Sequence, residues 1–326
     1  MYRKMMSLIV LVLGFSLGST SVIAQSSTYP NRPVRIIVPF APGGSADVAA
    51  RILSQRLSDI LKQSVFVENK AGAGASIGVQ YVANAPPDGY TYLMTSPALL
   101  VNAAWNGSAA GYNPEKDFAP IVMASNTPMG IFVGEKVNAN TLEELKQLAM
   151  KEKLSYATAG AGTPPNITCE NLFNLIWKAD ITHIPYKGSG PALLATVAGE
   201  TTITCGAMTG VSQFAKQGKV KVLAISSEKH LASLPNVPTL TELGYPNLRN
   251  DLWNGIFAPA KTPMDVKEKM NQAVNQALQN PDLIEKYDQN DLLPFGGSIK
   301  QTTDFINAES ERWNKTIKEM KAKGKS

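Results

Sequence analysis

The chain has 326 residues, of which 44% are hydrophobic and 17% are charged, and its net charge is +5 at neutral pH. That apolar fraction is ordinary for a globular protein with a packed core. Lysines and arginines are mixed with acids everywhere except near 318–325, where a solvated helix end explains the charge, so no nucleic-acid partner is expected. With two cysteines and two histidines, the chain has no Cys and His spacing of the kind that binds zinc.

The amino terminus predicts export. Arg3 and Lys4 precede an apolar run at 5–17, and Val22 and Ala24 occupy the −3 and −1 positions of a small-residue cleavage site. This is the pattern of a Sec-type signal peptide spanning 1–24, with cleavage after Ala24, because the apolar run is too short for a membrane span. The rest of the chain should be a soluble exported protein, long enough for two domains.

Strands and helices are expected to alternate along the chain. Short β-branched runs predict buried strands, and apolar residues with a 3.6-residue period predict helices. The predicted strands are 34–38, 65–67, 90–95, 121–123, 131–133, 155–158, 182–186, 203–205, 220–226 and 252–258. Predicted helices start near Asp47 and at the capping box 141–144, two more follow the loops 72–76 and 160–165, and others cover 193–199, 264–279 and 299–322.

This alternation predicts an α/β fold with parallel, doubly wound sheets. The pattern restarts after Asp117, as expected for two lobes that share strands across a hinge. We assign residues 25–124 and 248–326 to the first lobe and residues 125–247 to the second.

Three loops, at 40–47, 72–78 and 160–166, each follow a predicted strand and precede a predicted helix. In open α/β sheets ligands bind at the carboxyl ends of strands, where helix N-termini offer unpaired N–H groups to an anion. The two adjacent glycines of the first loop let the backbone approach a ligand closely. Asp47 could either cap its helix or contact the ligand. An anion-binding site between these loops is therefore expected.

The second loop does not predict a dinucleotide cofactor. After Gly72 and Gly74 the next glycine is Gly78, so the spacing is not G-x-G-x-x-G, and no acid follows at the distance that would hold a ribose. The chain also lacks a G-x-S-x-G nucleophile elbow.

The histidines and cysteines give little support to an enzyme. His183 is expected to be a packing or edge residue, and His230 a surface residue. Cys169 has no histidine near it in sequence that could activate it. Cys169 and Cys205 could form a disulfide in an oxidising compartment or could be two small buried side chains, and both alternatives stay open.

Motifs along the whole chain resemble those of the tripartite tricarboxylate transporter receptors, also called the Bug family. The matching stretches are Tyr29-Pro30-x-Arg32-Pro33-Val34-Arg35, Val38-Pro39-Phe40-x-Pro42-Gly43-Gly44-x-x-Asp47, Val67-Glu68-Asn69-Lys70-x-Gly72-Ala73-Gly74, Pro87-Asp88-Gly89-Tyr90-Thr91, Gly162-Thr163-Pro164-Pro165, Pro185-Tyr186-Lys187-Gly188, Leu234-Pro235-x-Val237-Pro238-Thr239 and Trp253-x-Gly255-x-x-Ala258-Pro259. No single stretch is decisive, but together they are specific.

The resemblance implies a two-lobed periplasmic-binding-protein fold of type II, the Venus flytrap, in which each lobe is a sheet flanked by helices. It implies that two loops hold a carboxylate, largely through backbone N–H groups and ordered waters. The ligand-binding residues expected in this chain are Phe40, Pro42, Gly43, Gly44, Asp47, Gly74, Ser76, Thr95, Gly162, Thr163, Asn166, Tyr186, Lys187, Gly206 and Met208.

The sequence departs from the family pattern at two places. Asn166 stands where the family usually has a histidine, and Gly206 and Ala207 stand where it often has an Asp-Asn pair. A missing acid leaves nothing to bind an ammonium, so an aromatic or longer aliphatic carboxylate is expected in preference to an amino acid.

The implied function is a monomeric periplasmic receptor that captures a small organic carboxylate for the membrane subunits of a tripartite tricarboxylate-type transporter. No cofactor, metal or catalytic residue is expected. The alternatives are a ligand sensor for a two-component kinase and, with less support, an exported hydrolase or isomerase.

Overall fold

The computed structural model describes residues 29–323, and the predicted signal peptide lies outside them. Within these residues, ten strands form one continuous sheet in the order β2-β1-β3-β9-β4-β7-β5-β6, with β8 and β10 both paired to β4. The strands are β1 Val34–Val38, β2 Val65–Asn69, β3 Thr91–Thr95, β4 Phe118–Gly134, β5 Ser155–Thr158, β6 Thr182–Pro185, β7 Ile203–Ala207, β8 Val220–Ile225, β9 Asp251–Pro259 and β10 Leu293–Gly296.

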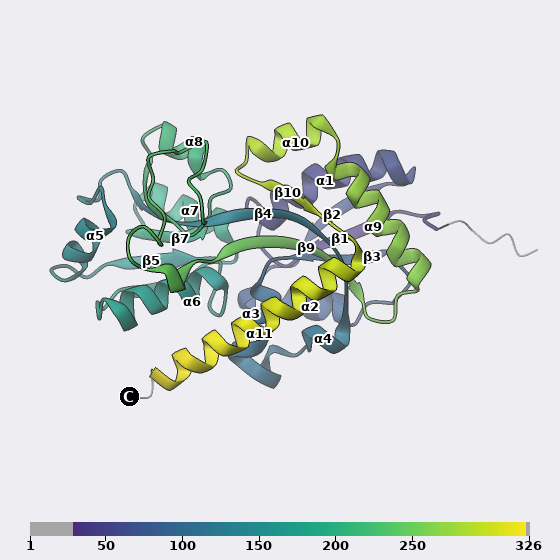
Figure 1. Cartoon of the computed structure of the whole chain (residues 1–326), viewed down its shortest axis with the longest axis horizontal. Coiled ribbons are helices and arrows are strands. Elements are labelled where there is room, and N and C mark those ends of the chain that lie inside the picture. The colour runs from purple at the N-terminus through teal and green to yellow at the C-terminus, as the bar shows by residue number, and fades with distance from the viewer. Residues whose placement is uncertain (1–28, 324–326) are drawn as a thin grey trace, which may run out of the picture.

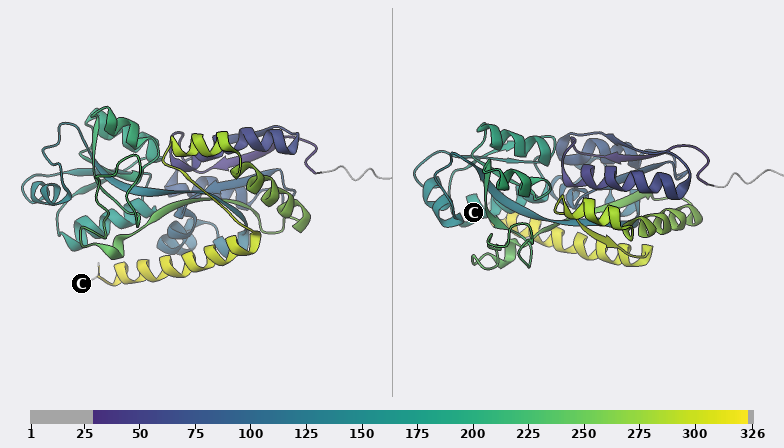
Figure 2. Two further views of the ribbon diagram at one scale, coloured as in Figure 1. Left: turned by 45° about the horizontal axis from the view of Figure 1, so that its top comes forward. Right: turned by 90° about the horizontal axis from the view of Figure 1, so that it is seen from above.

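Helices cover both halves of this sheet (Figures 1 and 2). They are α1 Ser45–Leu61, α2 Ser76–Ala83, α3 Ala98–Asn106, α4 Pro114–Asp117, α5 Leu142–Ala149, α6 Pro164–Glu170, α7 Ser189–Ala198, α8 Val211–Lys216, α9 Met264–Leu278, α10 Pro281–Asp288 and α11 Ile299–Lys323. The fold is thus α/β and two-lobed, as expected. No helix within residues 29–323 is both long and apolar enough to cross a membrane.

The two lobes share the long strand β4. Its first part pairs with β9 and β10, and its last part pairs with β7 and β8. The separate strands predicted at 121–123 and 131–133 are wrong, because they are parts of this single strand. Ser125 and Thr127 interrupt the apolar run in sequence, yet both are fully buried, and the Ser125 hydroxyl accepts a hydrogen bond from Asn254 Nδ2 at 2.9 Å.

The sheet is mixed, although wholly parallel sheets were expected. Strands β1, β2 and β3 are parallel, and so are β5, β6 and β7. In contrast, β4 is antiparallel to β7, β8, β9 and β10, and β9 is antiparallel to β3. The strands that connect the lobes therefore break the parallel pattern.

Each lobe has its own buried core. One cluster includes Leu53, Leu93 and Trp313, and another includes Tyr156 and Phe173. A smaller third cluster surrounds Phe132 and Met208.

Cys169 and Cys205 form a disulfide within the core that contains Tyr156, with an S–S distance of 2.09 Å. This resolves the two alternatives that the sequence left open. The bond joins α6 to β7.

Candidate functional site

A narrow cavity lies between the lobes, where helices α1, α6 and α7 begin. It is lined by Phe40, Gly44, Ser45, Ala46, Ser96, Ala159, Thr163, Pro164, Pro165, Ser189 and Leu252. The cavity volume is ≈ 30 Å³, the space of about two water molecules or of the two oxygens of a carboxylate. We call it the cleft cavity.

The two lobes are in contact beside the cleft cavity. The Ala41 N–H of one lobe donates a hydrogen bond to the Lys187 carbonyl of the other at 2.8 Å. A Cβ on Gly190 would lie 2.6 Å from the Pro42 carbonyl oxygen, and a Cβ on Gly74 would clash with the Ala161 carbonyl. Glycine at these positions therefore lets the backbones of the two lobes approach each other.

None of the residues that line the cleft cavity carries a charge. Helices α1 and α7 begin at its wall, and their N-caps, Gly44 and Gly188, have no side chain that could accept a hydrogen bond from the first-turn N–H groups. The N–H groups of a first helical turn have no acceptor within the helix, and they form the positive end of the helix dipole. The hydroxyls of Ser96 and Ser189 add donors, whereas the Ser45 hydroxyl donates to Asn254 Oδ1 at 3.3 Å. An anion can therefore be bound here without an ion pair.

Helix α6 contributes differently, because it begins with Pro164-Pro165, which have no N–H groups. The Thr163 hydroxyl donates to the Gly160 carbonyl at 2.7 Å, which fixes the preceding loop. This helix therefore shapes the cavity wall more than it donates to a ligand.

Three of the predicted residues, Phe40, Gly44 and Thr163, line the cleft cavity. Pro42, Gly43, Gly74 and Gly162 do not line it, but they lie at or beside the contact between the lobes. Ideal Cβ atoms on Gly43, Gly74 and Gly162 would meet Gly190, Ala161 and Asn102, respectively.

Asp47 supports the first loop and does not line the cavity. It is buried, with 3% exposure, and accepts hydrogen bonds from the Gly43 N–H at 3.0 Å and from Asn69 Nδ2 at 2.8 Å. Asn69 also donates to the Phe40 carbonyl at 3.0 Å. This network holds the backbone around Gly44 in place at the start of α1.

Asn166 plays the same part for the third loop. Its Oδ1 accepts from the Gly162 N–H at 3.0 Å, and its Nδ2 donates to the Tyr156 hydroxyl at 3.2 Å. Ser76, also buried, donates to Asn102 Oδ1 at 2.9 Å. Both side chains therefore stabilise loops near the cleft.

The remaining predicted residues lie at varied distances from the cleft cavity. The Lys187 side chain is exposed and Tyr186 is half-buried. Gly206 is adjacent to Ser189, and Met208 is fully buried against Gly130 in the third core cluster. Thr95, directly before Ser96, is fully buried and its hydroxyl has no hydrogen-bond partner within the described residues.

The histidines lie where they were expected. His183 is on the edge strand β6, stacks on Tyr156 with ring centroids 4.8 Å apart, and its Nε2 is 2.7 Å from Thr158 Oγ1. Burial lowers the pKa of His183, so its ring is neutral near pH 7. His230 is on the surface, where its Nε2 lies 2.8 Å from a Glu242 carboxylate oxygen.

Eight of the residues that line the cavity are not among those expected from the sequence: Ser45, Ala46, Ser96, Ala159, Pro164, Pro165, Ser189 and Leu252. Ser189 directly follows the Pro185–Gly188 motif at a strand-to-helix junction, and that position could have identified it. Leu252 reaches the site from a strand late in the chain, and nothing in its local sequence signals this.

Comparison with known proteins gives consistent matches. A family model described as "Tripartite tricarboxylate transporter family receptor" matches residues 49–322. Protein BugT of Bordetella pertussis is 34% identical over 324 residues, covering 98% of this chain and 99% of that protein.

Three solved structures are similar over most of this chain. Periplasmic binding protein BugD has a TM-score of 0.85 and 30% identity, covering 89% of this chain and 98% of that one. MatC from Rhodopseudomonas palustris with bound malate has a TM-score of 0.84 and 30% identity over 89% of this chain and all of that one. An R. palustris protein with adipate has a TM-score of 0.83 and 28% identity, covering 89% and 97% of the two chains.

Proposed function

The chain belongs to the tripartite tricarboxylate transporter receptor family, and from this premise we propose that it captures a small organic carboxylate in the periplasm. The family consists of solute-binding receptors and not of enzymes. The observation that carries the proposal is the convergence of the α1 and α7 N-termini on an uncharged cavity between the lobes. Such a site favours a carboxylate through backbone dipoles and hydroxyls.

The residues that line the cleft cavity also argue against an amino acid as the ligand. An α-ammonium needs an acid or several carbonyl acceptors, and no acidic side chain lines the cleft cavity. Malate and adipate, bound to two structural neighbours, are dicarboxylates without an amino group. We therefore expect an aliphatic or aromatic mono- or dicarboxylate.

Capture would proceed by closure of the lobes, with residues 25–124 and 248–326 moving against 125–247. Export through the signal peptide at 1–24 would place the receptor in the periplasm, as for the neighbour BugD. There the closed form would deliver its ligand, as a monomer, to the membrane subunits of a tripartite transporter.

A thermal-shift panel tests the proposal. The protein without residues 1–24 is heated with malate, adipate, benzoate, their amides, aspartate and glutamate. A bound ligand stabilises the folded state, by roughly 2.7 kcal/mol at a hundredfold excess over Kd, and so raises the melting temperature. We expect a shift with one or more carboxylates that is lost on amidation. Equal shifts with the amides, or the largest shift with aspartate or glutamate, would contradict the proposal.

A further inference from the structure

The backbone donors of the cleft cavity meet at one place. A Cβ added to Gly44, the N-cap of α1, would lie 3.6 Å from the backbone nitrogen of Ser189, where α7 begins. The N–H groups of both first turns have no acceptor within their own helices. Two helix N-termini this close together act on the same anion. The backbone therefore provides one position for a carboxylate.

The hydroxyls of the cleft cavity add few further donors. The hydroxyls of Ser45 and Thr163 already donate to oxygens of the protein, at 3.3 and 2.7 Å. Ser96 Oγ accepts a hydrogen bond from the Ala98 N–H at 3.3 Å, so its own proton can be donated to a ligand. Among the described residues that line the cavity, Ser96 and Ser189 thus keep hydroxyl protons for a ligand.

The side of the cleft cavity that α6 forms offers no backbone donor. The first two residues of this helix, Pro164 and Pro165, both line the cavity, and proline has no N–H group. Most other residues at a helix start would present a free N–H group there. The rest of the wall is apolar and consists of Phe40, Ala46, Ala159 and Leu252.

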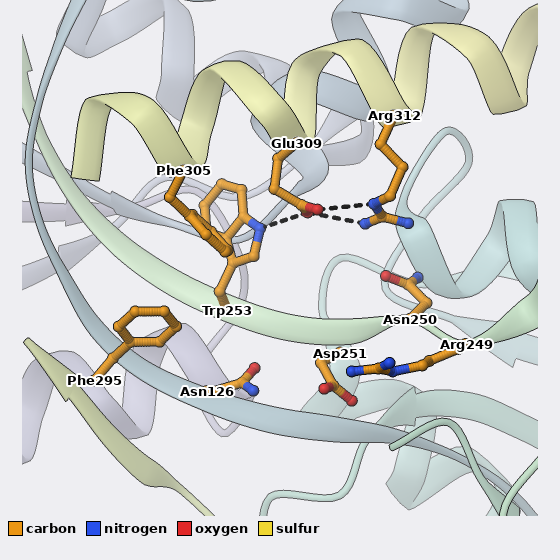
Figure 3. A pocket seen from close by; sticks show the side chains of 9 residues that line it. All are labelled: Asn126, Arg249, Asn250, Asp251, Trp253, Phe295, Phe305, Glu309 and Arg312. Carbon is orange, nitrogen blue, oxygen red and sulfur yellow. Dashed lines mark hydrogen bonds and ion pairs between the residues drawn. The ribbon is translucent and has the colours of Figure 1, made fainter. Parts of the chain in front are cut away.

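The charged side chains of β9 and its neighbourhood lie on the other face of the strand. Successive residues of a strand point to opposite faces. Leu252 borders the cleft cavity, whereas Asp251 and Trp253 border a separate cavity, which Arg249 also lines (Figure 3). Arg249 lies 2.6 Å from a carboxylate oxygen of Glu228. This arginine therefore does not offer its charge to a second carboxylate in the cleft.

The cleft cavity also has little room for a second polar group. Beside it the lobes are in close contact, since a Cβ on Gly43 would lie 3.6 Å from Gly190 Cα and one on Gly160 would lie 3.2 Å from Gly74 Cα. The volume of ≈ 30 Å³ fits one carboxylate group. A second carboxylate would be buried against apolar side chains, and an unpaired buried charge is strongly disfavoured.

We propose that the ligand is a monocarboxylate with an apolar body. Its carboxylate would lie at the N-termini of α1 and α7, and its body would lie against Pro164, Pro165 and Leu252. The two prolines disfavour a second carboxylate, because they remove the N–H groups that would bind it. The inference rests on the proposed function and narrows it, since that function includes dicarboxylates.

Three pairs of ligands test the inference, measured by calorimetry on the protein without residues 1–24. They are butyrate and succinate, hexanoate and adipate, and 4-methylbenzoate and terephthalate. The members of each pair have the same number of carbon atoms and differ in whether the far end is a methyl group or a carboxylate. We expect the tightest binder of the six to be a monocarboxylate that binds at least tenfold more tightly than its partner.

A dicarboxylate as the tightest binder, or a partner that binds within tenfold, would overturn the inference and leave the proposed function intact. If none of the six binds at millimolar concentration, the inference also fails. The proposed function fails with it only when the thermal-shift panel shows no carboxylate binding either. The two failures are therefore distinguishable.

Pro165→Ala tests the role of the prolines, because it gives the first turn of α6 a free N–H group and alanine is well tolerated in helices. The ratio of monocarboxylate to dicarboxylate affinity should fall at least threefold in this variant. Its binding of the monocarboxylate verifies that it is folded. Pro281→Ala, at the exposed first residue of α10, is the matched control and should keep the wild-type ratio. A wild-type ratio in Pro165→Ala would overturn the role assigned to the prolines.

Discussion

Ser189 provides a hydroxyl at the point where α7 begins and where the cleft cavity has no charged side chain. A hydroxyl that donates to a carboxylate contributes about 1.5 kcal/mol or more. Ser189→Ala should therefore weaken carboxylate binding about tenfold by calorimetry. Its melting temperature without ligand should be unchanged, because no other residue accepts a hydrogen bond from this hydroxyl within the described chain. Ser108→Ala, at an exposed position, is the matched control. Unchanged affinity in Ser189→Ala would show that the hydroxyl does not contact the ligand.

Asp251 should lower the stability of the folded protein at neutral pH. Burial raises the pKa of Asp251, and the positive charge of Arg249 opposes that rise only in part. The folded state therefore binds the proton more tightly than the unfolded state, and stability falls as pH rises from the unfolded pKa through the folded one. Asp251→Asn should accordingly have a higher melting temperature than the wild type at pH 7.

The gain in Asp251→Asn should shrink on acidification and vanish near about pH 3, where the aspartic acid is protonated in both states. Melting temperatures across this pH range measure it. A lower melting temperature for Asp251→Asn at pH 7 would show instead that the carboxylate makes a net favourable contact. A residue that lowers stability and faces a cavity is a candidate for a functional role.

At the level of single elements, periodicity in the sequence located most strands and helices of the lobes. It failed at β4, because the buried polar residues Ser125 and Thr127 are paired within the sheet and do not form a turn. It also gave no indication of α10 and β10, where β10 has four residues, three of them exposed. A short exposed strand has no apolar alternation to detect.

Only those residues of the candidate site that lie in loops with a recognisable local sequence pattern could be predicted. Phe40, Gly44 and Thr163 lie in loops whose glycines and prolines mark strand-to-helix junctions. Asp47 and Asn166 were expected to contact the ligand. In the structure they lie behind the loops that border the cleft cavity, where they accept hydrogen bonds from the N–H groups of Gly43 and Gly162. Which side of a loop faces a cavity depends on packing between distant segments, so single-sequence reasoning does not resolve it.

The disulfide between α6 and β7 should stabilise the second lobe. It closes a loop with a sequence separation of 36, for which the loop-entropy model gives about 3–4 kcal/mol. The double variant Cys169→Ala and Cys205→Ala should have a free energy of unfolding lower by that amount, measured by urea unfolding. Reduction of the wild type should likewise lower the urea concentration at its unfolding midpoint. Because both sulfurs are buried, reduction needs prior unfolding or long incubation. An unchanged midpoint in the double variant would contradict this role.

At the scale of the whole molecule, β4 and β9 are the strands through which the two lobes meet in one sheet (Figure 1). The cleft cavity is bordered by Leu252, and a separate cavity on the opposite face of β9 is bordered by the neighbouring residues Asp251 and Trp253. A change in the twist of β9 as the lobes close would alter both cavities at once. The position of the lobes is therefore the property that ligand binding should change most.

Gly190 allows the lobes to close, because it faces the Pro42 carbonyl across the cleft. A Cβ at this position would lie 2.6 Å from that oxygen, closer than van der Waals contact permits. Gly190→Ala should therefore keep the lobes farther apart and weaken carboxylate binding. The substitution should not destabilise α7 itself, since alanine is favoured over glycine in helices by about 0.5–1 kcal/mol.

Small-angle X-ray scattering measures this effect directly. With a saturating carboxylate, the radius of gyration of the wild type should decrease, and the decrease should be smaller in Gly190→Ala. Leu194→Ala, on the exposed face of the same helix, should behave like the wild type. Full compaction of Gly190→Ala with wild-type affinity would mean that Pro42 and Gly190 separate in the ligand-bound form. The contact between Pro42 and Gly190 would then exist only in a form whose lobes are closer together than in the ligand-bound form.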